Sequence, residues 1–191
     1  MNGPSTAAKR TRIVEGIFIE TDRLVLRLLE DRDAPAIASI RNTLDAARMA
    51  GDVPHPYPVE AAQGWIAMAR AKRMTLRSFS FAMEDPREGV VGDIGVFIRG
   101  RDPAWELGYA VDPRHRRRGY AREAVLGALA WARDVLKAQT VTAGVFADNA
   151  ASKRLLESCG FTLNGASTRV YSLARNAQVR CDTLVRDLTA S

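Results

Sequence analysis

The chain has 191 residues, of which 47% are hydrophobic and 26% are charged. These values are ordinary for a soluble globular protein and allow one domain with a proper core. No apolar run approaches the ~20 residues of a membrane-spanning helix, and Met1 to Arg12 lack the apolar core of a signal peptide, which argues against a membrane protein. We expect residues 1–16 to be a flexible tail and residues 17–188 to form a single domain.

The formal net charge of +6 favours an anionic partner, which could be nucleic acid, the ribosome or a phosphorylated cofactor. Genomic composition bias is the alternative explanation, since arginine greatly outnumbers lysine. The two cysteines, Cys159 and Cys181, show no metal-type pairing. A reduced cytoplasmic protein without a bound metal is the simplest interpretation.

The first half of the chain predicts an extended segment followed by helices. Leucines alternate with other residues within 17–29, which is typical of a strand. Asp33 before Ala34-Pro35 is suited to start a helix, because aspartate caps helices and proline is tolerated in the first turn. We expect this helix to continue in pieces toward Met49. The segment 51–60 is too rich in turn residues to be regular, and helical spacing returns over 59–72.

The second half predicts a meander of strands and then alternating helices and strands. The expected elements are strands at 78–83, 90–100 and 105–111, a helix at 120–137, a strand at 140–146, a helix at 150–159, and strands at 161–174 and 179–188. The first three strands have short links and imply an antiparallel meander. The strand–helix–strand order that follows implies a parallel or splayed pair.

The most informative stretch is WELGYAVDPRHRRRGYARE at 105–123. Apolar residues alternate up to Val111, Asp112-Pro113 ends the strand, and four arginines crowd the loop before Gly119. A helical stripe begins directly after this glycine. Free amides at a helix start, close backbone approach at a glycine and fixed positive charge together favour a phosphate or pyrophosphate ligand.

Arg116-x-x-Gly119-x-Ala121 fits the pyrophosphate-binding signature Arg/Gln-x-x-Gly-x-Gly/Ala of the GNAT superfamily of N-acetyltransferases. Three further segments resemble the ribosomal-protein N-acetyltransferase branch of that superfamily, the RimJ/RimL type, in the same order along the chain. They are TDRLVLRLL at 21–29, HPYPVEAAQGWI at 55–66 and DNAASKRLLESCGF at 148–161. The resemblance covers roughly residues 17–188.

The resemblance implies an α+β GNAT fold, with a central, mostly antiparallel twisted sheet of about seven strands that is splayed at the cofactor site and flanked by about four helices. It implies direct transfer of acetyl from acetyl-CoA to a primary amine, with a protein N-terminal α-amine as the first candidate. A small-molecule amine such as an aminoglycoside, polyamine or amino acid is the alternative acceptor. A non-catalytic RNA- or ribosome-binding module stays open as a different class, although the arginines lack interleaved aromatic residues. No membrane partner is expected, and a monomer and a homodimer are both possible.

Coenzyme A carries about four negative charges, which loop amides and arginines can bind and neutralise. By resemblance, a second group of residues aligns the thioester arm, and Asn149 contacts the pantetheine while also capping a helix. The expected cofactor-binding residues are Tyr109, Ala110, Val111, Arg116, Arg117, Arg118, Gly119, Tyr120, Ala121, Asn149 and Ser152.

Two residues are candidates for catalysis. Glu106 lies just ahead of the expected splay and could act as the base for the incoming ammonium, directly or through water; alternatively it binds a basic substrate or faces solvent. Many members of the superfamily have a tyrosine four residues before the Gly-Phe pair that protonates the leaving thiolate, and here that position is Leu156. Ser152 or a water must then serve as the acid, although Ser152 could also be a surface serine.

Overall fold

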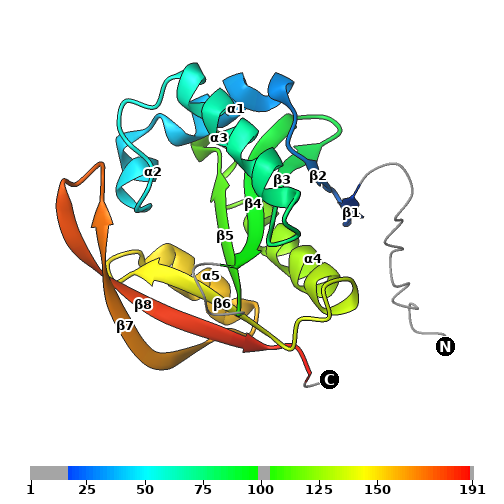
Figure 1. The fold of residues 1–191 in the computed structure, drawn as a ribbon, viewed down its shortest axis with the longest axis vertical. Coiled ribbons are helices and arrows are strands. Elements are labelled where there is room, and N and C mark those ends of the chain that lie inside the picture. The colour runs from blue at the N-terminus through cyan, green and yellow to red at the C-terminus, as the bar shows by residue number, and fades with distance from the viewer. Residues whose placement is uncertain (1–16, 99–103, 190–191) are drawn as a thin grey trace.

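The computed structural model describes residues 17–98 and 104–189, which form one eight-stranded sheet with helices on both of its faces (Figure 1). The strand order is β1-β2-β3-β4-β5-β6-β8-β7. The structure confirms the expected mixed, mostly antiparallel GNAT-type sheet, with eight strands instead of about seven and five α-helices instead of about four. The expected tail at 1–16 and turn at 100–103 lie outside the described residues.

The strands are β1 (Phe18–Glu20), β2 (Val25–Leu28), β3 (Ser78–Asp85), β4 (Gly89–Ile98), β5 (Trp105–Val111), β6 (Thr140–Phe146), β7 (Thr162–Ser172) and β8 (Ala177–Asp187). The extended segment expected at 17–29 is therefore a hairpin of two short strands. It turns at Thr21, whose hydroxyl hydrogen-bonds the Leu24 carbonyl oxygen at 3.1 Å. This turn divides the segment into β1 and β2, which accounts for the eighth strand.

The helices are α1 (Ala34–Arg41), α2 (Leu44–Arg48), α3 (Val59–Arg73), α4 (Tyr120–Asp134) and α5 (Ala150–Ser158). Thr43 caps α2 by accepting a hydrogen bond from the Ala46 amide, so the first helical region is interrupted, as expected. Helix α4 ends three residues before the expected Lys137. Residues between α2 and α3 form neither helix nor strand, in agreement with their turn-rich sequence. None of the helices in the described ranges is long and apolar enough to span a bilayer.

Strands β2 to β5 form an antiparallel wing whose two faces carry different side chains. One face packs apolar residues of each strand against α4, including Phe81, Ile94 and Leu107. The other face packs against α1 and α3 where Ala82, Val90 and Ala110 lie. Beyond these residues the second face has serine, glycine and charged residues together with Phe97, which leaves space above the sheet.

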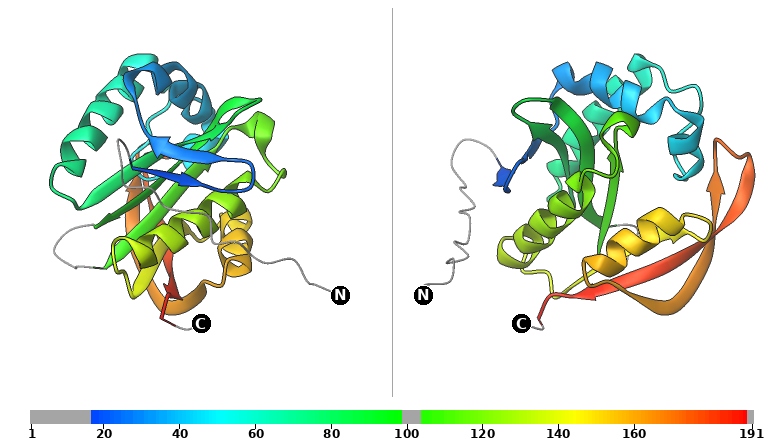
Figure 2. Two further views of the ribbon diagram at one scale, coloured as in Figure 1. Left: turned by 90° about the vertical axis from the view of Figure 1, so that its right-hand side faces the viewer. Right: turned by 180° about the vertical axis from the view of Figure 1, so that it is seen from behind.

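The junction between β5 and β6 is the main irregularity of the sheet. The two strands pair in parallel at Trp105↔Val141 and Glu106↔Thr142, and no pair follows these. Beyond this point β5 continues with β4, whereas β6 continues with β8. The strand–helix–strand segment thus gives a parallel pair that splays, as its order predicts. Strands β6, β8 and β7 form the second wing, and the two wings diverge from this junction, as the right-hand view of Figure 2 shows.

Two glycines offer a test of how tightly the wing is packed. A Cβ on Gly92 would lie 2.5 Å from the Ala110 carbonyl oxygen and 2.8 Å from the Met83 sulfur, so Gly92→Ala forces the sheet backbone apart. We expect it to reduce the free energy of unfolding by about 1–3 kcal/mol. Gly64→Ala is the control, because a Cβ there meets nothing within 4 Å; it should stabilise α3 by about 0.5–1 kcal/mol. Urea unfolding measures both, and equal effects of the two changes would contradict the packing described.

Candidate functional site

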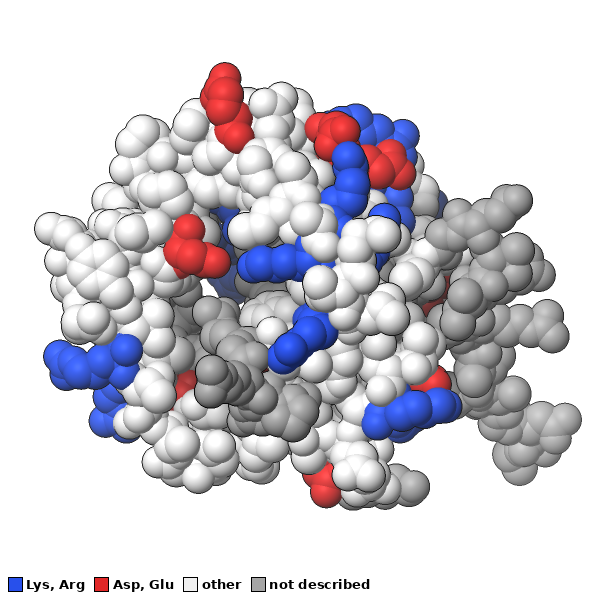
Figure 3. Space-filling view, in the orientation of Figure 1, with Lys and Arg blue, Asp and Glu red and all other residues white. Residues whose placement is uncertain are grey.

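A cavity of about 1940 Å³ occupies the space where the two wings of the sheet separate. On one side it is lined by the arginine-rich loop, the start of α4 and the first turns of α5. On the other side it is lined by α2, α3 and the β7–β8 hairpin. In space-filling view this region is a hollow bordered by both acidic and basic side chains (Figure 3). The cavity can therefore receive two ligands that approach from different sides.

The arginine-rich loop turns sharply before α4. Gly119 precedes the helix with a φ of +84°, and Arg117 also has a positive φ of 63°. Both residues line the cavity, as do Arg116 and Ala121. The first-turn amides of α4 lack acceptors within the helix and, together with these exposed guanidinium groups, provide donors and positive charge for an anion. The loop thus combines a glycine at positive φ, free helix amides and exposed arginines, which are the features from which the sequence predicts a phosphate site.

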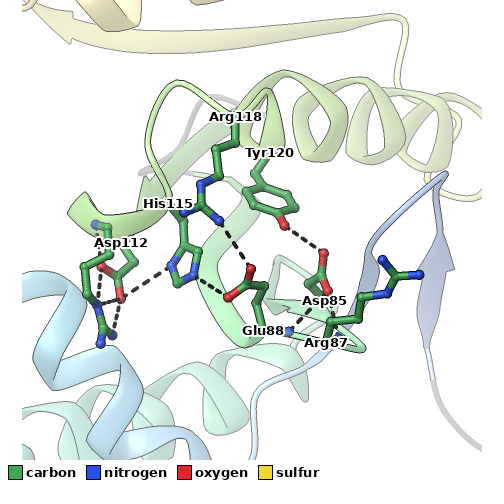
Figure 4. Close-up of polar contacts among 8 residues, drawn as sticks. Asp85, Arg87, Glu88, Asp112, His115, Arg118 and Tyr120 are labelled. Carbon is green, nitrogen blue, oxygen red and sulfur yellow. Dashed lines mark hydrogen bonds and ion pairs between the residues drawn. The ribbon is translucent and has the colours of Figure 1, made fainter.

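The loop is held from behind by the turn between β3 and β4 (Figure 4). The Arg118 guanidinium lies 3.2 Å from Glu88, and the buried His115 ring lies 3.3 Å from the same carboxylate. The Tyr120 hydroxyl donates to Asp85 at 2.8 Å. The hydrogen bond to this carboxylate raises the pKa of Tyr120. The side chains of Arg118 and Tyr120 thus anchor the loop, and Arg118 does not line the cavity.

Two further ion pairs fix the ends of the loop. At its start, Arg114 contacts Asp112 at 2.6 Å, and this hydrogen-bonded guanidinium lowers the pKa of the buried Asp112 carboxyl. At its end, Arg23 contacts Glu123 at 2.8 Å and donates a second hydrogen bond to the Arg118 carbonyl oxygen. These pairs neutralise charge locally. Among the clustered arginines, Arg116 and Arg117 are left to face the cavity.

Glu106 lies at the last paired position before the splay, opposite Thr142. Its side chain is half-buried and lines the cavity on the face that also carries Gly108 and Ala110. A Cβ placed on Gly144 of β6 would lie 3.9 Å from Glu106 Oε1, so the carboxylate reaches across to the second wing. The structure thus places this candidate base at the meeting point of the two wings, as its position in the sequence predicts.

Tyr109, Ser152 and Asn149 form a connected group on the opposite face of β5. The Tyr109 hydroxyl is 2.8 Å from Ser152 Oγ, and Asn149 Oδ1 accepts a hydrogen bond from the Ser152 amide. Burial raises the pKa of Tyr109 to about 12. Leu156, which occupies the position of the usual tyrosine, is buried in the core beneath this group. A hydroxyl pair from a strand and a helix therefore lies where the sequence suggested only a serine.

Comparison with known proteins assigns the fold and the family. The sequence profile described as "Acetyltransferase (GNAT) domain" matches residues 23–162. The chain belongs to the GNAT family. It is 30% identical over 173 residues to YoaA of Bacillus subtilis, an uncharacterized N-acetyltransferase, across 83% of this chain and 97% of that relative. It is 28% identical over 162 residues to the [ribosomal protein uS5]-alanine N-acetyltransferase of Escherichia coli, across 80% and 81% of the two chains.

The fold is also that of solved GNAT structures. RimJ of Mycobacterium smegmatis, in complex with CoA-disulfide, superposes with a TM-score of 0.80 at 18% sequence identity, covering 92% of this chain and 89% of that chain. The resemblance to the RimJ/RimL branch is thereby confirmed, and the protein is a GNAT-type N-acetyltransferase. Within the described ranges, no group of three or more His, Cys, Asp or Glu residues is arranged to hold a metal ion.

The sequence did not reveal the acceptor side of this GNAT cavity. Arg41 of α1 lies 2.6 Å from the buried Asp93 of β4 and stacks on Trp65 of α3, with its guanidinium carbon 3.9 Å from the ring centroid. Burial opposes the charge of Arg41, but the neighbouring Asp93 carboxylate keeps its pKa raised. The available signal in the sequence was Asp93, a charged residue among the glycines and apolar residues of β4. Its partner lies 52 positions away and could not be inferred from local spacing.

Proposed function

We propose that the protein transfers acetyl from acetyl-CoA to a primary amine, and that its acceptor is the N-terminal α-amine of a protein. The observation that carries the proposal is the cavity that joins the Gly119 loop to the splay at Glu106. One end of this space is suited to a pyrophosphate, and its middle contains a carboxylate on one face and a hydroxyl pair on the other. An acyl donor with a long phosphorylated arm fits this arrangement.

The residues present fit coenzyme A. Gly119 at positive φ and the free amides of Tyr120 and Ala121 suit the pyrophosphate, and Arg116 and Arg117 supply its counter-charge. Beyond Glu106, β5 has no pair with β6, so backbone groups between Tyr109 and Val111 are available to a pantetheine amide or a thioester carbonyl. Asn149 and Ser152 border the same space. In this proposal Arg118 contributes by holding the loop through Glu88.

The acceptor assignment is supported by one relative and by the carboxylates on the side of the cavity that α2 and α3 line. The Escherichia coli relative is named for acetylation of an alanine of a ribosomal protein. Asp45, Asp52 and Glu106 line this side of the cavity together with the basic residues Lys72 and Arg77, so the three carboxylates offer local contacts to a cationic amine although the whole chain is basic. Trp65, Met68 and Phe97 add apolar surface for the side chain of a first residue. A polyamine or another small amine is the alternative for the same wall.

In the proposed reaction, groups on opposite faces of β5 accept a proton from the amine and donate a proton to the leaving thiolate. An ammonium acceptor must lose a proton before it attacks the thioester carbon, and Glu106 can accept that proton directly or through water. The departing thiolate, with a pKa of roughly 8 to 9, is a much weaker base and a better leaving group than an alkoxide, so it depends less on protonation by a general acid. Because Tyr109 stays protonated to about pH 12, it can donate to Ser152 Oγ and leave the serine hydrogen free for the sulfur.

Gly119→Glu tests the cofactor site. The change adds bulk and negative charge where the pyrophosphate is expected, so the affinity for acetyl-CoA in calorimetry should fall by roughly tenfold to a hundredfold. Gly165→Glu is the matched control, because Gly165 has a similar φ of +80° but lies on exposed β7 with nothing within 4 Å of a Cβ. The control should bind like the wild type. Intact affinity in Gly119→Glu would overturn the assignment.

Glu106→Gln tests the base. The amide cannot accept a proton, so kcat for acetylation of an alanine-first peptide should fall by about a hundredfold or more. Raising the pH should partly restore the rate, since it supplies neutral amine without the carboxylate. Glu157→Gln, on the exposed face of α5, is the control and should keep the wild-type pH–rate profile. The role of Glu106 is rejected if its amide variant retains both kcat and the profile.

Tyr109→Phe tests the hydroxyl pair. Loss of the hydrogen bond to Ser152 should lower kcat by about tenfold and leave the affinity for acetyl-CoA unchanged. Because burial raises the pKa of Tyr109 to about 12, the wild type should show no loss of rate between pH 7 and 10 from this group. Tyr57→Phe, a buried tyrosine beside Arg41, controls for removal of a hydroxyl from the core. An unchanged kcat in Tyr109→Phe would exclude the pair from catalysis.

A further inference from the structure

Arg175, in the turn between β7 and β8, connects three segments that are distant in sequence. Its Nε donates to the Arg48 carbonyl oxygen at the end of α2 at 2.7 Å. Its Nη1 and Nη2 donate to the two carboxylate oxygens of Asp148, in the β6–α5 loop, at 2.7 and 3.1 Å. The guanidinium carbon also lies 5.3 Å from the centroid of the Phe146 ring. One side chain thus joins α2, the start of α5 and the tip of the hairpin.

Further hydrogen bonds and close packing between the hairpin and the residues after α2 reinforce this Arg175 bridge. The Leu173 amide donates to the Gly51 carbonyl oxygen at 3.0 Å, and the Ser172 hydroxyl donates to the Ala50 carbonyl oxygen at 3.2 Å. A Cβ on Gly51 would lie only 2.9 Å from the Val170 side chain, so the two segments are in close contact. The Arg175 side chain is 14% exposed, and its hydrogen bonds hold the pKa of Asp148 below the usual range. The Asp148 side chain is 53% exposed, so the strength of the contact comes from its bidentate geometry and from the shielded guanidinium.

The bridge lies at the open end of the splay. At one end the wings are joined by the pairs of β5 with β6. At the other end the hairpin tip meets α2 and the residues that follow it, as Figure 1 shows at its left edge. Met49, Ala50 and Gly51 line the cavity from one side of this contact, and Val170, Tyr171 and Leu173 line it from the other. The β5–β6 junction and the Arg175 bridge thus join the two wings at both ends of the splay and form a ring around the cavity. Glu106 lies at the β5–β6 end of this ring.

We propose that Arg175 is a specificity-determining residue, which fixes the width of this ring and restricts the acceptor to a primary amine at the end of a slender, flexible chain. The inference rests on the proposed N-acetyltransferase function. A ring excludes by size, because a bulky amine built of several linked sugar rings does not fit between both walls, whereas a peptide N-terminus does. Asp148 directly precedes Asn149, so the bridge also fixes the start of α5 on the cofactor side.

The test compares two acceptors with the full-length enzyme and acetyl-CoA. One is a tetrapeptide that begins with alanine, and the other is kanamycin, a bulky aminoglycoside of three linked rings. The wild type should prefer the peptide in kcat/KM. Arg175→Ala should shift the ratio of kcat/KM values toward kanamycin by about tenfold, mainly through the two KM values, because the ring loses its charged link. Arg180→Ala is the matched control, since Arg180 lies in the same hairpin and pairs with Asp182 at 2.9 Å, away from the bridge.

A second variant covers the case in which Arg175→Ala does not fold. Gly51→Val pushes against Val170 from the opposite segment without changing Arg175, and it should shift the acceptor ratio in the same direction. A wild type that prefers kanamycin, or folded variants with an unchanged ratio, would overturn the proposal while leaving the acetyltransferase assignment intact. A wild type that binds acetyl-CoA but acetylates neither amine would contradict the proposed function, and this inference with it.

Discussion

The early separation of β5 from β6 is the constraint on which the rest of the structure depends. Two neighbouring strands that stop pairing leave backbone donors and acceptors without their sheet partners, which costs free energy unless other groups satisfy them. Each strand tolerates the separation because its other edge is fully paired, with β4 or with β8. The unpaired edges then face a cavity in place of a packed interior. The sheet thereby provides both the opening and the backbone groups that a ligand in it can use.

The arginine-rich loop illustrates how a strongly basic segment becomes a local site. Asp112, Glu88 and Glu123 bind arginines on the side of the loop that faces the protein. The hydrogen bond from Arg114 lowers the pKa of Asp112, so this support stays ionised over the neutral range. The positive charge that remains points into the cavity at Arg116 and Arg117. The unpaired positive charge of this loop is thus concentrated at one concave site, whereas a nucleic acid is bound by positive charge spread over an extended surface.

Sequence periodicity predicted most of the fold because each element buries one face, and burial imposes the spacing. It missed the turn at Thr21, where a side-chain hydrogen bond helps to divide the expected single strand into a hairpin, and it overextended α4. For the site, local motifs identified the Gly119 loop and Glu106, since their residues are adjacent in sequence. The Arg41–Asp93 pair and the Arg175 bridge were not predictable, because they join positions that only the completed sheet brings together.

In the proposed reaction, the alternation of β5 places the groups for the two proton transfers on opposite faces of the sheet. Glu106 lies on the acceptor face with Gly108 and Ala110, whereas Tyr109 lies on the face that packs against α4 and α5. A group bound in the splay between them would meet a proton acceptor on one side and a proton donor on the other. This arrangement also explains why Leu156 is tolerated. Leu156 is buried in the core, and the phenolic hydroxyl that α5 lacks at this position comes from Tyr109 of β5, which hydrogen-bonds Ser152 of α5.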